Sequence, residues 1–358
     1  MNENEPLRVG IVGYGLAGSV FHAPLVATTP GMRIAAISVG DATRTAKARH
    51  DYPNATIYPT AQALLGAMET LDLVVVAAPN DAHASVGIAA LEAGLPVVID
   101  KPFAANSADA RRVMETARRT GKLLTVFQNR RWDSDFLTVR QLIAGGALGK
   151  VSRLESRFER FRPAPKAGAW RESDAPELAG GLLFDLGAHL IDQALQLFGA
   201  PTSVYAEQDR RRPGVRVDDD TFVALRFGGG EVAHLWMSVI PRILGPRLRI
   251  VGSVGVYEKF GLDPQEAQLG AGVRPGDADY GREPREQWGR LATEINGVAV
   301  DGAVESLPGS YQNYYAGVRD AIREGKPAPV DPADSLRVIE VIEAARTSAE
   351  RGEVVRLT

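Results

Sequence analysis

Apolar runs rich in β-branched residues alternate with stretches of helical periodicity over the first third of the chain. Such continuous runs are typical of strands buried on both faces of a parallel sheet, whereas antiparallel strands more often alternate apolar with polar positions. Between the runs, residues 85–93 end at Gly94 and residues 107–120 end at Gly121, where a helix C-cap would place glycine. The pattern predicts a doubly wound sheet over roughly residues 1–127. The apolar runs lie at 7–13, 33–38, 71–79, 96–100 and 123–128.

The remainder of the chain has a different pattern. Its strand-like runs, several of which alternate polar and apolar positions, lie at 151–161, 221–227, 231–239 and 248–252. The segment 270–305 is rich in glycine and charge, and we expect it to be an excursion at the edge of the domain. Helical periodicity at 311–324 and 332–350 closes the chain. We therefore predict two domains, at 1–127 and 128–358.

A glycine motif stands between the first predicted strand and a helix expected to begin near residue 16. Its first glycine permits a tight turn, its second lets the backbone approach a pyrophosphate, and its third allows the helix to pack closely on the strand. Backbone N–H groups at the helix start would hold the phosphates. A glycine-rich turn that binds nothing is the alternative, but the placement of the motif favours dinucleotide binding. The motif consists of Gly13, Tyr14, Gly15, Leu16, Ala17 and Gly18.

The end of the second strand bears on the choice of cofactor. NAD-selective sites usually carry an acidic residue there, which binds the ribose 2′-hydroxyl. This chain has Ser38 instead, and Arg44 follows it. A small hydroxyl and a cation leave room for the 2′-phosphate of NADP, which a carboxylate would repel. Asp41 lies close enough to take the acidic role, so the pattern favours NADP only weakly and leaves NAD open.

The composition excludes several kinds of site. The 358 residues include no cysteine, which excludes disulfides, thiolate metal sites and a cysteine nucleophile, and is compatible with a cytoplasmic protein. The 41 basic and 44 acidic residues give a net charge of -3, so the composition does not predict binding to nucleic acid or an anionic membrane. Neither a signal peptide nor a membrane span is expected. The basic run at 210–212 is interpreted as a solvated hairpin loop.

Residues capable of chemistry gather at two places in the middle of the chain. The first is Asp100-Lys101-Pro102, at the end of a predicted strand and therefore on the carboxyl edge where ligands of open α/β sheets bind. The Lys101 ammonium could neutralise a developing alkoxide or hydrogen-bond a substrate hydroxyl. Most lysines are solvated, so a surface lysine at the start of a loop is the alternative.

The second place is an apolar helix entered from Gly180 and Gly181, on which Asp185 and His189 stand four residues apart. This spacing puts both side chains on one face, where the carboxylate can orient the imidazole or share the substrate with it. A buried Asp–His pair that serves only the structure is the alternative. A metal site is disfavoured because no further histidine or acidic residue stands at ligand spacing.

Together the glycine motif, Asp100-Lys101-Pro102 and Asp185-x-x-x-His189 resemble the glucose-fructose oxidoreductase/inositol dehydrogenase (Gfo/Idh/MocA) family, and the likeness runs nearly end to end. The resemblance implies a Rossmann domain followed by an α/β domain with an open, mostly antiparallel sheet. It also implies a homodimer or homotetramer formed through the outer face of that sheet, and last helices that pack near the cofactor domain. Longer strings that look most like the scyllo-inositol 2-dehydrogenase branch lie at 129–136, 160–163, 170–172 and 257–264.

The resemblance further implies hydride transfer between NADP or NAD and a secondary hydroxyl of a cyclic polyol or sugar, with scyllo-inositol and its 2-keto product as the expected pair. Lys101 would match the family's lysine, with Asp100 in place of the usual glutamate. His189 would take or return the hydroxyl proton, and Asp185 would orient it and hold the substrate. Further expected cofactor contacts are Pro79, Asn80, His83, Asp100, Lys101 and Asn129. Further expected substrate contacts are Arg131, Arg162, Trp170 and Arg171.

Alternatives exist for several of these assignments. Arg162, Trp170 and Arg171 could instead form a structural cluster between the domains, and His83 could be a helix residue with no ligand. Family members that use NAD transiently, including glycosidases, would keep the same lysine, aspartate and histidine positions. A dinucleotide-binding regulator without chemistry is disfavoured by the joint presence of those three residues.

Overall fold

The chain forms two compact units, each assembled from three separate segments. The computed structural model describes residues 5–165, 172, 174–175 and 178–357. Unit 1 comprises Met1–Asn129, Gln265–Tyr280 and Ser310–Leu336. Unit 2 comprises Arg130–Pro264, Gly281–Gly309 and Arg337–Thr358. Within the described residues, no helix combines the length and the apolar character needed to cross a membrane.

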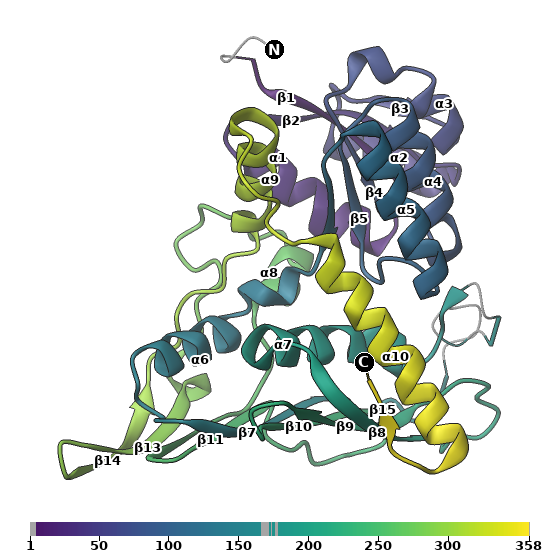
Figure 1. The fold of residues 1–358 in the computed structure, drawn as a ribbon. Coiled ribbons are helices and arrows are strands. Elements are labelled where there is room, and N and C mark those ends of the chain that lie inside the picture. Colours follow the sequence, from purple (N-terminus) through teal and green to yellow (C-terminus); the bar gives the residue numbers. More distant parts are fainter. Residues whose placement is uncertain (1–4, 166–171, 173, 176–177, 358) are drawn as a thin grey trace. The chain divides into compact units, whose positions relative to one another are not determined.

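Unit 1 is built on a six-stranded parallel sheet in the order β3-β2-β1-β4-β5-β6 (Figure 1). The doubly wound Rossmann sheet expected from the apolar runs is confirmed. The strand order reverses between β1 and β4, and open α/β sheets bind ligands beyond the carboxyl ends of the strands at such a point. The strands are β1 (Leu7–Val12), β2 (Met32–Ser38), β3 (Thr56–Tyr58), β4 (Leu73–Val76), β5 (Val97–Asp100) and β6 (Leu124–Phe127).

The helices of unit 1 follow the predicted periodicity, with one early start. Helix α5 has the predicted bounds, and Gly121 ends it in the left-handed conformation at φ +67°. Helix α4 packs beside α5 but begins at Asn80, earlier than the predicted residue 85, with Pro79 at its N-cap position. The helices are η1 (Ala17–His22), α1 (Ala23–Thr28), α2 (Ala42–Asp51), α3 (Ala61–Leu65), η2 (Met68–Thr70), α4 (Asn80–Glu92), α5 (Ser107–Thr120), α8 (Gln265–Gly270) and α9 (Gln312–Glu324).

Unit 2 is built on a nine-stranded sheet in the order β14-β13-β12-β11-β7-β10-β9-β8-β15 (Figure 1). Only β7 and β10 pair in parallel, so the expected mostly antiparallel sheet is confirmed. Buried and partly exposed positions alternate along β7, as in a sheet with one covered face. The strands are β7 (Val151–Glu159), β8 (Pro201–Asp209), β9 (Asp220–Phe227), β10 (Val232–Ser238), β11 (Leu248–Gly252), β12 (Gly255–Lys259), β13 (Gly289–Ile295), β14 (Val298–Val304) and β15 (Val355–Arg356).

The segment 270–305 is more regular than the expected excursion. It contains β13 and β14, which form a hairpin at one edge of the sheet. Its turn consists of Asn296 at φ +51° and Gly297 at φ +80°. Asn-Gly is the preferred pair for a two-residue turn in which both residues have positive φ. The turn pair was therefore the signal for this hairpin. The segment does lie at an edge of the sheet, as expected, but it contains two regular strands.

The remaining helices of the chain include those that cover one face of the unit 2 sheet. Helix α7 packs on β7 and β10. Helix α10 starts in unit 1 and continues in unit 2, and η3 crosses the boundary between the units at Asn129. These helices are η3 (Asn129–Trp132), α6 (Ser134–Ala144), η6 (Leu183–Gly187), α7 (Ala188–Phe198), η7 (Arg285–Gln287) and α10 (Pro332–Arg351).

The basic run at 210–212 does lie in a hairpin connection, between β8 and β9. It is not solvated throughout, because Arg212 is only 7% exposed. Its Nε lies 2.9 Å from Asp219 Oδ2, and its Nη2 lies 3.0 Å from Glu172 Oε2. A buried guanidinium is stable where carboxylates supply the opposite charge. The prediction of a solvated loop was therefore wrong for Arg212.

Candidate active site

The glycine motif forms the turn after β1 and leads into η1. Gly13 has φ +98°, and a Cβ there would lie 2.4 Å from the carbonyl oxygen of Ala77. A Cβ on Gly18 would lie 2.1 Å from the carbonyl oxygen of Gly13, whereas a Cβ on Gly15 would meet no atom within 4 Å. Two glycines are thus needed for the packing of the turn itself. Gly15, the second glycine of the motif, leaves an open surface, which fits the close approach of a pyrophosphate at a helix start.

The other motif residues have separate positions. Tyr14 is buried, and its hydroxyl donates a hydrogen bond to Asp51 Oδ2 at 2.7 Å. Burial, followed by this hydrogen bond, raises the pKa of Tyr14 above its usual range. Leu16 is exposed and Ala17 begins η1. The side chain of Tyr14 therefore anchors the turn inside the unit, and a ligand would meet its backbone.

The end of β2 carries the residues expected to choose between NAD and NADP. Ser38 is buried at the last position of the strand. Asp41 is the N-cap of α2, where its Oδ1 accepts a hydrogen bond from the Arg44 backbone N–H at 2.8 Å. The Arg44 Nε lies 3.9 Å from the same oxygen, and both side chains are exposed. Asp41 thus caps α2, and the nearby Arg44 guanidinium partly neutralises the negative charge of its carboxylate.

The end of β5 places Lys101 beside a network of buried titratable groups. Asp100 Oδ1 accepts a hydrogen bond from the Lys101 backbone N–H at 2.9 Å and lies 3.5 Å from His22 Nε2. His22 Nδ1 lies 2.6 Å from the Tyr315 hydroxyl oxygen on α9. Burial alone would raise the pKa of Asp100, but the hydrogen bond and charge of His22, with the charges of His83 and Lys101, hold this pKa below its usual range.

Sequence reasoning missed His22 and Tyr315. His22 stands on a mostly apolar helix four residues after the motif, and a buried histidine in such a place must find a partner. That partner is on α9, almost three hundred positions away in the chain, so spacing could not identify it. The peptide bond from Lys101 to Pro102 is cis.

The residues after β4 form the start of α4. Pro79 stands at the N-cap position, and Asn80 and His83 are buried in the first turn. His83 Nδ1 lies 2.7 Å from the carbonyl oxygen of Pro102, and its Nε2 lies 2.9 Å from that of Ala78. Both ring nitrogens therefore contact backbone carbonyls of the turns after β4 and β5.

In unit 2, the helix that carries Asp185 and His189 has a fixed start. Gly181 has φ +94°, and a Cβ there would lie 1.9 Å from Asp218 Oδ1. The backbone N–H of Leu183 donates to Asp218 Oδ2 at 2.8 Å. Burial raises the pKa of Asp218 above its usual range, although the hydrogen bonds it accepts oppose the shift. Glycine is needed at position 181 because the Asp218 carboxylate occupies the space where a Cβ would lie.

Asp185 and His189 are 8% and 5% exposed. Asp185 lies in the π-helical turn η6 and His189 in the α-helical continuation α7. The sequence had predicted a plain α-helix, but four residues are close to one full turn in either geometry, so both residues still occupy one side of the helix. Single π-helical turns inside α-helices frequently occur at functional sites.

The expected substrate residues are placed differently from one another. Arg131 is buried and makes a bidentate ion pair with Asp192, with distances of 2.9 Å from Nε and 2.7 Å from Nη2. Asp192 lies three residues after His189 on α7 and was not singled out from the sequence. Arg162 is exposed, and its backbone N–H donates to Val239 O at 2.9 Å. Trp170 and Arg171 lie outside the described residues.

Within unit 1, Ser38 ends β2, and the glycine motif, Asn80, Lys101 and Asn129 follow the carboxyl ends of other strands. Asp185, His189 and the arginines belong to unit 2. The described part of the chain contains no group of three or more histidine, aspartate or glutamate residues arranged to hold a metal ion.

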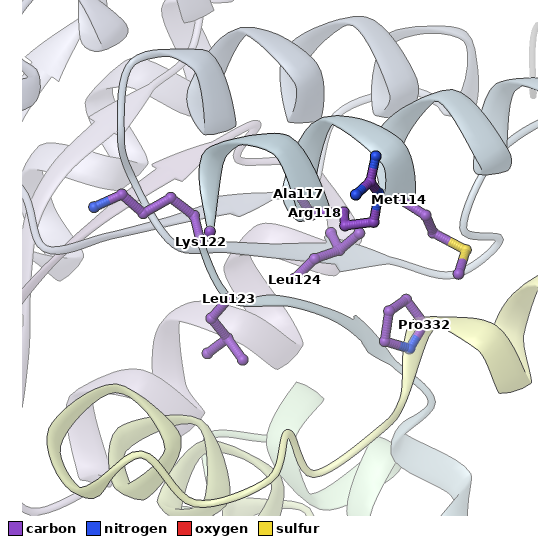
Figure 2. A pocket seen from close by; sticks show the side chains of 8 residues that line it. Met114, Ala117, Arg118, Lys122, Leu123, Leu124 and Pro332 are labelled. Carbon is purple, nitrogen blue, oxygen red and sulfur yellow. The ribbon is translucent and has the colours of Figure 1, made fainter.

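The groove drawn in Figure 2 is a separate feature of unit 1. Its volume is about 390 Å³, and it lies between α5, β6 and the start of α10. Figure 2 shows Met114 and Pro332 at one end and Lys122 at the other. No residue expected to bind cofactor or substrate lines it. We therefore place the candidate site at the motifs described above.

Comparison with known proteins agrees with both units. A family model described as an oxidoreductase family with an NAD-binding Rossmann fold matches residues 7–128, and the model of its C-terminal alpha/beta domain matches residues 140–357. The uncharacterized oxidoreductase YdgJ of Escherichia coli is 40% identical over 98% of each chain. The scyllo-inositol 2-dehydrogenase (NADP(+)) IolW of Bacillus subtilis is 35% identical over 99% of this chain and 96% of its own length.

Among solved structures, the oxidoreductase yvaA of Bacillus subtilis superposes with a TM-score of 0.94 and 34% identity over 100% of both chains. The family models, the full-length relatives and this structure cover both units. The chain belongs to the Gfo/Idh/MocA family of oxidoreductases, with an NAD-binding Rossmann domain followed by a C-terminal α/β domain.

Proposed function

We propose that this chain is an NAD(P)-dependent dehydrogenase that acts on a secondary hydroxyl of a cyclic polyol or sugar, with scyllo-inositol and its 2-keto product as the substrate pair. The observation that carries the proposal is the buried pair Asp185 and His189, one turn apart on a helix of a family oxidoreductase. A carboxylate and an imidazole in this order are suited to hold a hydroxyl and move its proton.

The proposed roles follow from the chemistry of each side chain. In the oxidation direction the His189 imidazole takes the hydroxyl proton while the Asp185 carboxylate orients the ring. The Lys101 ammonium stabilises the oxygen as negative charge develops on it. When bound, the nicotinamide would supply the acceptor for the hydride that leaves the carbon bearing this oxygen. The product is a ketone, and His189 returns the proton when the reaction runs in reverse.

The substrate class is supported by the name of the Bacillus subtilis relative, a scyllo-inositol 2-dehydrogenase similar over the full chain. Arg131, Arg162, Trp170 and Arg171 are proposed to border the substrate site. For Arg131 this role is indirect, because its guanidinium is bound to Asp192 on the helix of His189. It would hold that helix in place under the substrate.

We propose NADP as the preferred cofactor. Ser38 supplies no carboxylate at the end of β2, and Arg44 is an exposed cation in the first turn of α2. Asp41, the residue able to favour NAD, already accepts the capping hydrogen bond of that helix. The Bacillus subtilis relative is named as an NADP(+) enzyme. Pro79, Asn80 and Asn129 are proposed to border the nicotinamide end of the cofactor.

We further propose a homodimer or homotetramer that associates through the outer face of the unit 2 sheet. Aromatic side chains gather on that face: Phe222 and Trp236 have ring centroids 5.1 Å apart, and the Arg157 guanidinium lies 3.9 Å from the Trp236 ring centroid. Such aromatic and arginine groups are enriched where protein surfaces associate. Light scattering of the purified protein tests this, and a monomer at all concentrations would refute it.

The test of the function is the absorbance of reduced nicotinamide when purified protein is mixed with NADP or NAD and a panel of inositols and aldoses. Reduction of NADP with scyllo-inositol is the expected result. His189→Ala should lower turnover by about a hundredfold or more while leaving dinucleotide affinity unchanged, because only a general base is lost. His50→Ala, on the exposed side of α2, is the control. Dinucleotide binding without turnover on any polyol or sugar would favour a transient-NAD enzyme or a regulator.

A further inference from the structure

One buried side chain joins the turns that follow β4 and β5. His83 lies in the first turn of α4 and is 1% exposed. Its ring nitrogens lie 2.7 Å from the carbonyl oxygen of Pro102 and 2.9 Å from that of Ala78. Ala78 comes two residues after the end of β4, and Pro102 comes two residues after the end of β5. Since β4 and β5 are neighbours, the ring bridges adjacent turns at the carboxyl edge of the sheet.

Both partners of the ring are hydrogen-bond acceptors. A carbonyl oxygen only accepts hydrogen bonds, so the ring bonds it by donating an N–H. His83 therefore faces one acceptor from each of the two turns.

The turn after β5 also carries Asp100, which comes directly before Lys101 in the chain. His22 first, and then His83 and Lys101, hold the pKa of Asp100 below its usual range against the cost of burial. The other titratable groups of this network are His22 and Tyr315.

We propose that His83 is a positioning residue for Lys101. Lys101 lies between two anchored neighbours: Asp100 is 3.5 Å from His22, and Pro102 is bonded by His83. The bond from His83 to Ala78 ties this turn to the one that leads into α4. His83 therefore acts through the backbone on either side of it, in place of the cofactor contact expected from the sequence. The part that Lys101 takes in hydride transfer rests on the proposed function, whereas the anchoring of its turn does not.

The test is hydrogen exchange with mass spectrometry on the full chain, comparing the wild type with His83→Phe and His83→Gln. His83→Phe keeps a flat ring but donates to neither carbonyl, so exchange should become about 5- to 10-fold faster in peptides covering both turns, 77–80 and 100–104. His83→Gln keeps an amide donor and should give a smaller effect, and it remains informative if the phenylalanine variant does not fold. His50→Phe makes the same change on the exposed side of α2 and should alter neither peptide.

Two outcomes would overturn the proposal. One is a folded His83 variant in which exchange at 100–104 is unchanged or rises only within α4. The other is an equal rise in every peptide of unit 1, including those of α9, because that would reflect a general loss of stability.

A second readout concerns the reaction. The kcat of His83→Gln should fall by about tenfold while the KM for the dinucleotide changes by less than about threefold, since a displaced Lys101 affects the chemical step more than cofactor binding. The reverse pattern, a raised dinucleotide KM with an unchanged kcat, would assign His83 to cofactor binding and overturn the proposal. If the wild type turns over no polyol or sugar, the proposed function fails, and the exchange data still decide whether His83 holds the turn.

Discussion

Replacement of Gly15 by alanine should separate dinucleotide binding from folding. A Cβ on Gly15 would meet no atom within 4 Å, and its φ lies outside the left-handed range. Gly15→Ala should therefore leave stability unchanged or raise it by roughly 0.4–1 kcal/mol, because alanine restricts the unfolded chain. Gly18→Ala differs, since its Cβ would lie 2.1 Å from the carbonyl oxygen of Gly13 and force two segments of backbone apart.

The binding effect of Gly15→Ala follows from where the methyl group points. It would stand on the open surface where the turn meets the pyrophosphate. A phosphate displaced by that methyl group loses a charge-assisted hydrogen bond from the backbone, at a cost of about 1.5–3 kcal/mol. This corresponds to a rise of about 10- to 150-fold in the Kd for the dinucleotide.

The Kd is measured by fluorescence titration with reduced NADP, and the Tm by thermal unfolding of the same samples. Gly302→Ala, on strand β14, is the matched control because its Cβ also meets no atom within 4 Å. A wild-type Kd for Gly15→Ala would show that the dinucleotide does not pass over this glycine. A joint fall in affinity and Tm would contradict the separation of binding from folding.

Three further changes test other parts of the structure. Asp192→Asn leaves the buried Arg131 guanidinium without its countercharge and should lower the free energy of unfolding by about 3–5 kcal/mol in urea titrations, and a loss below about 1 kcal/mol would contradict this. Because the folded pKa of Asp100 is lowered, its ionisation stabilises the fold above the unfolded pKa and this contribution disappears as pH falls through the folded pKa. Asp100→Asn should therefore be less stable near neutral pH and lose less stability below about pH 4, and an unchanged acid slope would exclude the effect. Ser38→Asp should raise the Kd for NADP relative to NAD by about tenfold or more, and an unchanged ratio in the same titrations would remove Ser38 from cofactor selection.

The fold was predictable wherever burial leaves a pattern in the sequence. The strands of unit 1 are covered on both faces, so they read as continuous apolar runs. Strand β3 has only three residues and is partly exposed, and it left no such run. Strand β14 is exposed along almost its whole length, so only its Asn-Gly turn could have indicated it.

The candidate site was predictable where a residue acts through its own neighbours in the chain. Gly18 belongs to this group, because a Cβ there would meet Gly13 of the same turn, whereas a Cβ on Gly13 would meet Ala77, which follows β4. The capping of η6 by Asp218 depends on a connection between two strands far along the chain. The contact between His22 and Tyr315 depends on α9. No spacing rule joins such partners, since only the folded topology brings them together.

The string 129–136 illustrates the same limit in a different way. Its charged residues look like a substrate-binding run, yet they are buried and bonded within unit 2: Arg130 Nη1 lies 3.3 Å from Asp133 Oδ2, and Arg247 Nε lies 3.3 Å from Asp135 Oδ2. Burial, only partly offset by the charge of Arg130, raises the pKa of Asp133 well above its usual range. Removing one member of a buried ion pair leaves the other buried without a countercharge. Folding therefore constrains these residues as tightly as a bound ligand would. A likeness carried by it therefore extends to the way α7 is held, because Arg131 of this string is bound to Asp192 on that helix.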